Sequence, residues 1–108
     1  MDVFFCDSKF ESQMSTSKAR RKAFGAERAK KLDIRRAQID AADTLADLRN
    51  LPGRWHELTG DWAGHLAVSL DGPYRLILAP TTRPELPDGS LDWGAVTAVV
   101  LVGVVDYH

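Results

Sequence analysis

Hydrophobic and polar positions divide the chain into a short apolar start, a long charged middle and a second half of strand-like segments. The run VFFC at residues 3–6 predicts a strand. Residues 15–50 contain no proline and are rich in Ala, Arg, Lys and Leu, which favours helix. Gly25 is placed to end one helix before a second begins near Ala26. We therefore expect a helical hairpin in this region.

The second helix of this hairpin carries an apolar stripe at three- and four-residue steps, formed by Ala29, Leu32, Arg36 and Ile39. In this stripe Arg36 is expected to lay its aliphatic stem along the core and to hold its charge in water. Leu45 and Leu48 predict one further short turn, which the Pro-Gly pair at residues 52–53 ends.

The second half of the chain has the pattern of a sheet. Apolar residues alternate over 66–70, the turn sequence DGP follows at 71–73, and residues 74–79 return as a second strand, which predicts a β-hairpin. A proline-rich loop at 79–93 leads to the apolar run at 98–105, which we expect inside the sheet. The chain is predicted to be one α+β domain over residues 1–108. Its N-terminal strand and helical hairpin would pack on one face of a mainly antiparallel sheet.

Charge is unevenly spread along a chain whose net charge is only -1. Residues 16–54 hold eleven basic and five acidic side chains, so this segment carries +6 and the remainder carries -7. Such a block is either a solvated helix surface or a site that attracts a polyanion.

The cysteine content and the lengths of the apolar runs limit the class of protein. Cys6 is the one cysteine, so an internal disulfide is excluded, and CxxC spacing and the HExxH motif are absent. The apolar runs are too short for a signal peptide or a membrane span. We expect a cytoplasmic protein that acts without a metal, a cofactor or a membrane.

Three histidines and one arginine are the candidates for chemistry. Imidazole ordinarily titrates near neutrality, so two of them beside a phosphodiester can act as general base and general acid. His56 stands in the run RWHEL, His65 opens the alternating strand and His108 is the last residue of the sequence. Arg75 is the one arginine within the predicted sheet. A guanidinium can stabilise the extra charge of a phosphorane. Taken singly, His56 is equally consistent with a hydrogen-bonded structural residue, Arg75 with an ion pair to Glu57, and the last two residues with a frayed terminus.

The run RWHELTGDWAGHLAVSLDGPYRLIL, preceded by AERAKKL and TLADLRNLPG and closed by LDWGAVTAVVLVGVVDYH, resembles the HigB, or killer-protein, branch of the RelE/ParE toxin superfamily. The resemblance covers about residues 17–108. It implies the compact RelE-like fold and a type II toxin-antitoxin toxin that cleaves mRNA on the ribosome, with the ribose 2′-OH as nucleophile.

The resemblance also implies roles for single residues. Arg75 would bind the scissile phosphate, and His56 and His108 would transfer protons. Tyr107 would stack on a base or hold the phosphate, and Asp106 would orient its neighbours.

The family resemblance implies partners as well. These are a helix-turn-helix, HigA-like antitoxin, and the ribosome with its mRNA. The basic helical block would be the ribosome- or RNA-binding surface, made by Lys18, Arg20, Arg21, Lys22, Arg28, Arg35 and Arg36.

Two positions depart from the family pattern. Thr59 and Trp62 stand where several HigB-type toxins have basic residues, which removes positive charge near the expected phosphates. They favour an alternative in which the chain is a non-enzymatic or catalytically weak toxin-fold protein. It would be either a ParE-like gyrase inhibitor or mainly an antitoxin-binding partner.

Overall fold

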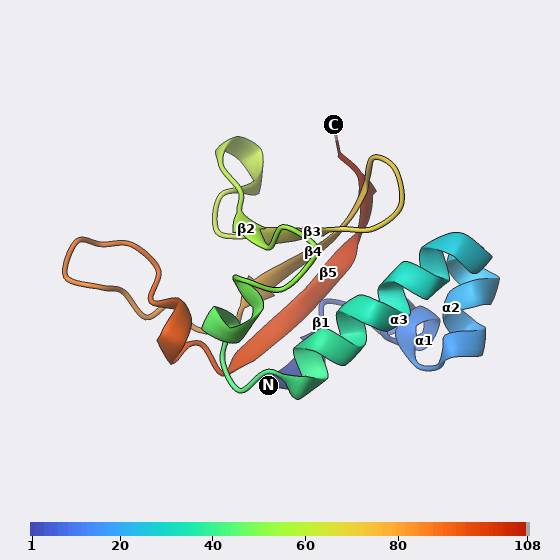
Figure 1. The fold of residues 1–108 in the computed structure, drawn as a ribbon, viewed down its shortest axis with the longest axis horizontal. Helices are drawn as coiled ribbons and strands as arrows, with labels where there is room; N and C mark the ends of the chain where they lie inside the picture. Colours follow the sequence, from blue (N-terminus) through green and yellow to red (C-terminus); the bar gives the residue numbers. More distant parts are fainter. Residues whose placement is uncertain (108) are drawn as a thin grey trace.

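The computed structural model describes residues 1–107, which form an α+β domain built on one five-stranded sheet (Figure 1). The strand order is β1-β5-β4-β3-β2. The strands are β1 (Asp2–Phe5), β2 (His56–Glu57), β3 (Leu66–Ser69), β4 (Tyr74–Pro80) and β5 (Ala98–Asp106). The α-helices are α1 (Ser8–Met14), α2 (Ser17–Phe24) and α3 (Ala26–Ala41), and the short 3-10 turns are η1 (Leu45–Leu48), η2 (Gly60–Trp62) and η3 (Trp93–Ala95).

The sheet confirms the predicted strands and adds a parallel pair. The hairpin of β3 and β4 is antiparallel, β4 is antiparallel to β5, and the short β2 is antiparallel to β3. The first strand, β1, is an edge strand and runs parallel to β5, with Asp2 opposite Ala98. The apolar strand β5 therefore has a neighbour on each side, as its sequence predicts.

The helical region also follows the prediction, with one helix that was not expected. Gly25 adopts φ 85° between α2 and α3, so a residue without a side chain separates the two helices. The additional helix α1 begins where the Asp7 side chain accepts a hydrogen bond from the backbone N–H of Phe10 at 2.7 Å. Its Phe10 and Met14 are buried in the core.

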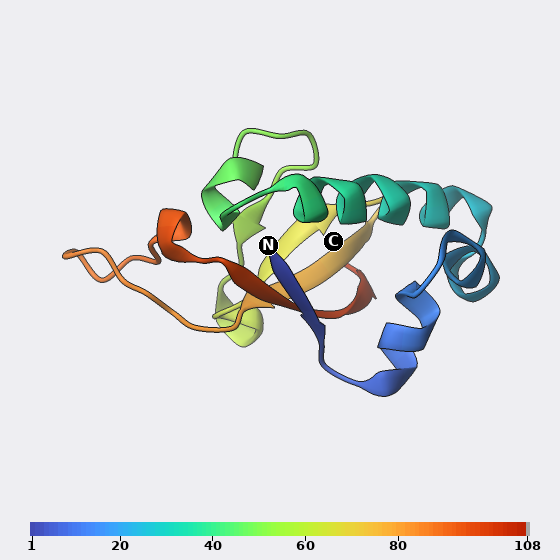
Figure 2. The same ribbon diagram turned by 90° about the horizontal axis from the view of Figure 1, so that it is seen from below.

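Helix α3 lies along one face of the sheet and closes the larger of two hydrophobic clusters (Figure 2). The other face carries a small cluster of Leu58, Ala67 and Ile77, against which Trp62, Val102 and Val105 pack. None of these six residues belongs to α1, α2 or α3. This second face is therefore the one on which strand side chains are accessible.

The buried stripe of α3 differs from the prediction at one position. It consists of Ala29, Leu32, Arg35 and Ile39. Arg35 is only 6% exposed, whereas Arg36 is half-buried and forms an ion pair with Asp40 at 3.0 Å. The arginine in the core is therefore Arg35.

None of the helices in residues 1–107 is both long enough and apolar enough to cross a membrane.

Candidate functional site

A pocket of about 220 Å³ opens at the second face of the sheet, where β2, β3 and β4 meet the end of β5. Its lining residues come from four separate parts of the chain and are Arg54, His56, Ser69, Arg75 and Tyr107. The sequence predicts three of them, His56, Arg75 and Tyr107, as site residues. The fold therefore brings these three together.

Strand register explains this convergence. Ser69 on β3 lies opposite Arg75 on β4, which lies opposite Val105 on β5. His56 on β2 lies opposite Ala67 on β3, one of the residues of the second face. Because alternate residues of a strand share a face, these pairings align His56, Ser69 and Arg75 on the same side. The strand pairing therefore brings His56, Ser69 and Arg75 to one side of the sheet.

His56 has an exposed side chain whose tautomer can be inferred from one hydrogen bond. Its Nδ1 lies 2.6 Å from the carbonyl oxygen of Arg54. A carbonyl oxygen can only accept, so Nδ1 is the ring nitrogen that carries the hydrogen. In the neutral imidazole Nε2 then holds the free lone pair, so His56 can accept a proton at Nε2.

Arg75 does not form the ion pair with Glu57 that its sequence position leaves open. Glu57 accepts a hydrogen bond from Trp93 Nε1 at 3.1 Å and pairs with Arg83 at 3.6 Å. Arg75 Nη1 instead donates to the carbonyl oxygens of Gly72 and Tyr74, at 3.0 and 2.9 Å. The guanidinium is therefore held by neutral acceptors and not by a carboxylate.

The turn at residues 52–54 forms the rim of the pocket next to His56. Gly53 has φ 123°, and a Cβ at this position would lie 2.6 Å from Cγ2 of Val68, so only glycine fits. The carbonyl oxygen of Gly53 accepts hydrogen bonds from Ser69 N and Ser69 Oγ, at 2.8 and 3.0 Å. Arg54 follows with φ 59°, an uncommon conformation for a residue with a side chain. The turn is thus fastened to β3, and Arg54 is held at the rim.

Arg35 secures this turn from the opposite side. Its Nε donates to the carbonyl oxygen of Ser69 at 2.8 Å, and its Nη1 donates to that of Pro52 at 3.1 Å. Burial lowers the pKa of the Arg35 guanidinium. The expectation that Arg35 belongs to an exposed RNA-binding surface is therefore wrong, because its side chain connects α3 to β3 and to the turn.

The C-terminal candidates have different places. Tyr107 is one of the residues that line the pocket, and its backbone N–H donates to the carbonyl oxygen of Pro73 at 2.9 Å. Asp106 lies opposite Tyr74 at the end of β5 and is not among the lining residues. His108 lies outside the residues that the structure describes.

Most of the predicted RNA-binding arginines are neutralised within the fold. Arg20 pairs with Asp33 at 2.6 Å, and Arg36 pairs with Asp40. Burial raises the pKa of Asp33, but hydrogen bonds from Ser17 and Arg20 outweigh it and hold this pKa below its usual value. Arg28 contacts both carboxylate oxygens of Asp71, and its Cζ lies 3.4 Å from the centre of the Tyr74 ring.

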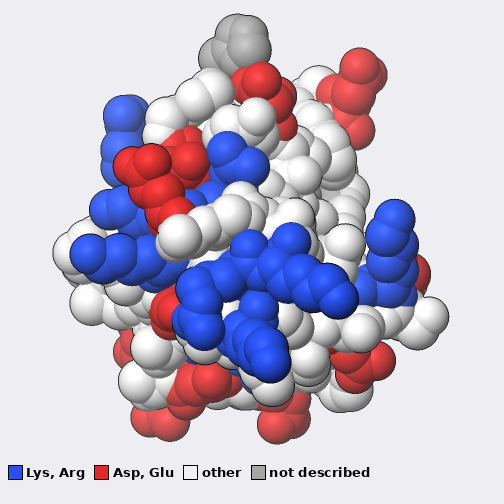
Figure 3. Space-filling model, turned by 90° about the vertical axis from the view of Figure 1, so that its right-hand side faces the viewer, with Lys and Arg blue, Asp and Glu red and all other residues white. Residues whose placement is uncertain are grey.

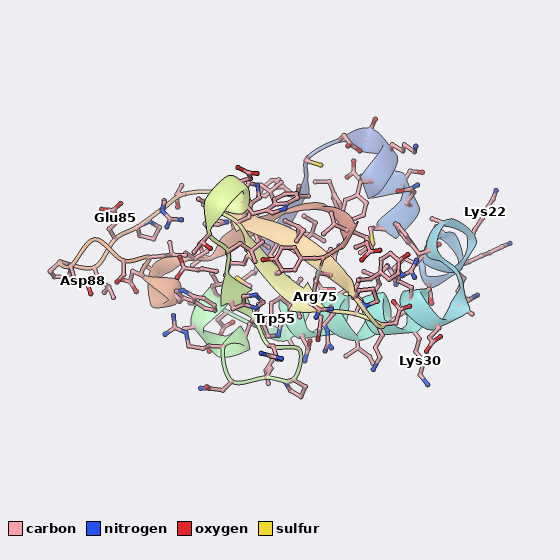
Figure 4. The ribbon with its side chains drawn as sticks, turned by 90° about the horizontal axis from the view of Figure 1, so that it is seen from above. Lys22, Lys30, Trp55, Arg75, Glu85 and Asp88 are labelled. Carbon is pink, nitrogen blue, oxygen red and sulfur yellow. The ribbon has the colours of Figure 1, made fainter. Side chains whose placement is uncertain are left out.

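The remaining basic side chains gather at one end of the molecule. Lys and Arg side chains form a group across the middle of this end, with acidic side chains above and below it (Figure 3), and Lys22 and Lys30 project from this end (Figure 4). Glu85 and Asp88 lie at the opposite end, in the loop before η3 (Figure 4). Of the predicted surface, the exposed cations without an ion pair among residues 1–107 are Lys18, Arg21 and Lys22. We call these three residues the basic end.

Sequence reasoning missed Arg54 and Ser69 as pocket residues. A signal for Arg54 was present, because it stands two residues before His56 and directly after the Pro-Gly turn. Ser69 has no such signal, since its part depends on the hydrogen bonds to Gly53. His65 lies away from the pocket, with Nδ1 at 3.2 Å from the carbonyl oxygen of Trp62.

The pocket has the chemistry of an anion site. It combines two guanidinium groups, an imidazole, a hydroxyl and a phenol. Within residues 1–107 no group of three or more His, Cys, Asp or Glu side chains is arranged to hold a metal ion. These pocket residues can bind an oxyanion and exchange protons with it.

A comparison with models of known protein families gives no match. A comparison with curated proteins gives none either.

Proposed function

We propose that the chain is a toxin of a type II toxin-antitoxin pair that cleaves mRNA on the ribosome, and that a helix-turn-helix antitoxin neutralises it. The observation that carries the proposal is the pocket, in which His56, Arg75 and Tyr107 meet although they are far apart in the sequence. These are three of the residues that the resemblance to the HigB branch assigns to catalysis. The pocket also lies on a face that the helices leave accessible to a large substrate.

In the proposed reaction the ribose 2′-OH attacks the adjacent phosphorus, and the P–O5′ bond breaks. His56 Nε2 takes the proton of the 2′-OH, since Nδ1 is engaged with Arg54. Arg75 stabilises the additional negative charge of the phosphorane. A protonated His108 supplies a proton to the leaving 5′-oxygen. The products are a 2′,3′-cyclic phosphate and a 5′-hydroxyl end, so atoms and charges balance without another reactant.

The basic end is proposed to direct the protein to ribosomal RNA. All three cations lie on α2, at the opposite end of the molecule from the loop that holds Glu85 and Asp88 (Figures 1 and 4). Such a separation of charge orients a protein in the field of a polyanion. The pairing of Arg20, Arg28 and Arg36 leaves a smaller positive surface than the sequence implies.

The second candidate is a non-enzymatic toxin-fold protein, and Trp62 favours it. Trp62 packs on the apolar cluster of the second face and stacks edge-on against His65, with the ring centres 5.3 Å apart. It serves the fold at a position where several family members carry a positive charge.

Induction of the chain in bacteria separates the two functions. We expect the wild type to arrest growth and to produce mRNA fragments with 5′-hydroxyl ends. Arg75→Ala, and a chain that lacks His108, should each lose cleavage by roughly 10²- to 10⁴-fold. Expression of a neighbouring helix-turn-helix protein should relieve the arrest. Equal arrest by these variants would exclude the nuclease and favour inhibition through binding.

A further inference from the structure

Arg54 and Arg75 are distinguished from most other arginines by their partners. Arg20, Arg28, Arg36 and Arg83 each pair with a carboxylate. In the part of the chain that the structure describes, neither Arg54 nor Arg75 has a carboxylate within 4.0 Å, yet both line the same pocket. Two arginines without a carboxylate partner therefore line one small pocket. Figure 4 labels Arg75 beside the β3–β4 hairpin.

The backbone at Arg54 adds a second, independent observation. A non-glycine residue at φ 59° stores strain that the surrounding structure must maintain, and such residues cluster at functional sites. Two sets of hydrogen bonds maintain it here. Ser69 donates from its backbone N–H and its hydroxyl to the carbonyl oxygen of Gly53, and Arg35 donates to that of Pro52. Glycine would satisfy the turn at residue 54 without strain, but it would remove the cation from the rim.

We infer that Arg54 and Arg75 together form a binding site for a doubly charged phosphoryl group. A phosphodiester carries one negative charge, and the phosphorane formed by attack of the 2′-OH carries two. A pair of guanidinium groups matches the second state better than the first. Arg54 thus becomes a catalytic residue that the resemblance does not assign, and this role rests on the proposed function.

Charge selectivity tests the pair without requiring cleavage. The probes are a nucleoside 3′-monophosphate, which is mainly a dianion above about pH 7, and a 2′-deoxy dinucleotide, which is a monoanion and cannot be cleaved. We expect the wild type to bind the monophosphate more tightly, as followed by the shifts of Arg Nε–H signals in NMR titrations. Arg54→Gln should weaken binding of the monophosphate roughly tenfold and remove most of the preference.

Three variants control the experiment. Lys9→Gln removes the same charge from α1 and should leave both affinities unchanged. Arg54→Lys should retain part of the preference, and Arg54→Gly removes the side chain while it permits the backbone conformation. If Arg54→Gln binds both probes as the wild type does while Arg75→Gln does not, the inference about Arg54 is wrong and the proposed function stands. If the wild type binds neither probe, the paired site is wrong. Growth arrest is scored separately, so its absence in the wild type counts against the nuclease alone.

Discussion

The Nε of Arg35 lies 2.8 Å from the carbonyl oxygen of Ser69 and joins the buried side of α3 to the strand that supports the pocket. The same guanidinium holds the carbonyl of Pro52, so one side chain fastens three segments. The Ser69 hydroxyl in turn donates to the carbonyl oxygen of Gly53, the residue before Arg54. The position of Arg54 at the pocket therefore depends on Arg35, which contacts the turn from the side of α3.

Replacement of Arg35 should lower the stability of the protein. Arg35→Met leaves the carbonyls of Ser69 and Pro52 without their charged donor, and we expect the free energy of unfolding to fall by about 2–4 kcal/mol. Arg35→Lys should also be destabilised, because an ammonium group cannot reproduce the fork. Urea denaturation measures both. Arg36→Met is the matched control and should change stability by at most about 0.5 kcal/mol, since its ion pair is exposed. Equal losses at the two positions would contradict the assigned role.

Gly53 should tolerate no side chain. In Gly53→Ala the new Cβ meets Val68 at 2.6 Å in addition to an unfavourable positive φ. Gly25→Ala shares the positive φ but meets nothing within 4 Å. We expect Gly25→Ala to cost about 1 kcal/mol and Gly53→Ala clearly more. Thermal unfolding of the two variants side by side measures the difference, and similar melting temperatures would show that the turn can move away from β3.

Arg54→Gly should separate stability from activity. Glycine relieves the left-handed backbone but increases the entropy of the unfolded chain, so we expect stability to remain equal or to rise by up to about 1 kcal/mol. Cleavage, if the chain is a nuclease, should fall roughly 10²-fold or more through the loss of a charge at the phosphorane. Calorimetry and a ribosome cleavage assay measure the two effects. A variant that loses stability would mean that the side chain is required for the turn itself.

His56→Asn should abolish proton transfer without disturbing the loop. The Asn amide can still donate to the carbonyl of Arg54, as Nδ1 does, but it has no counterpart of Nε2. We expect cleavage to drop by roughly 10²- to 10⁴-fold with an unchanged melting temperature. His65→Asn alters a histidine outside the pocket and should retain activity. Cleavage at the wild-type rate in His56→Asn would remove His56 from the reaction.

Charge reversal at the basic end should weaken ribosome binding. We expect the combined variant Lys18→Glu, Arg21→Glu, Lys22→Glu to co-sediment less with ribosomes and to show a shallower dependence on salt, because fewer counterions are released. Lys9→Glu reverses a charge on α1 outside the basic end and should have little effect. Unchanged sedimentation of the triple variant would exclude this surface as the docking site.

The sequence predicts the helices and strands of this fold better than the tertiary contacts of their side chains. The helical hairpin and the β-hairpin depend on local spacing and turn residues, and both are confirmed. The spacing of apolar residues predicts Arg36 in the buried stripe of α3, whereas the structure has Arg35 there. The error arises because both residues stand three or four positions from Leu32 and Ile39. Local periodicity cannot decide between them, because the choice depends on the carbonyls that Arg35 finds on β3 and on the turn.

The candidate site shows the same division. His56, Arg75 and Tyr107 could be selected from residue type and resemblance, and the structure places all three in one pocket. Ser69 could not be selected, since its place in the pocket depends on the docking of the turn at 52–54 against β3. Arg54 was marked only by its position two residues before His56 and directly after the Pro-Gly turn. Helix α1 was missed because it is only seven residues long and its sequence, SKFESQM, is mostly polar, so it shows no clear helical pattern.

The parallel pairing of β1 with β5 has a consequence for synthesis of the protein. β5 lies between β1 and β4, and Asp2 at the start of β1 pairs with Ala98 at the start of β5. β1 therefore cannot join the sheet until β5 has been made. Contacts between such distant segments form late and slow folding. A nascent chain therefore lacks the strand between β1 and β4, and Tyr107 directly after it, until β5 has been synthesised. The pocket is therefore incomplete while residues 1–97 are being made, because Tyr107 is one of its lining residues.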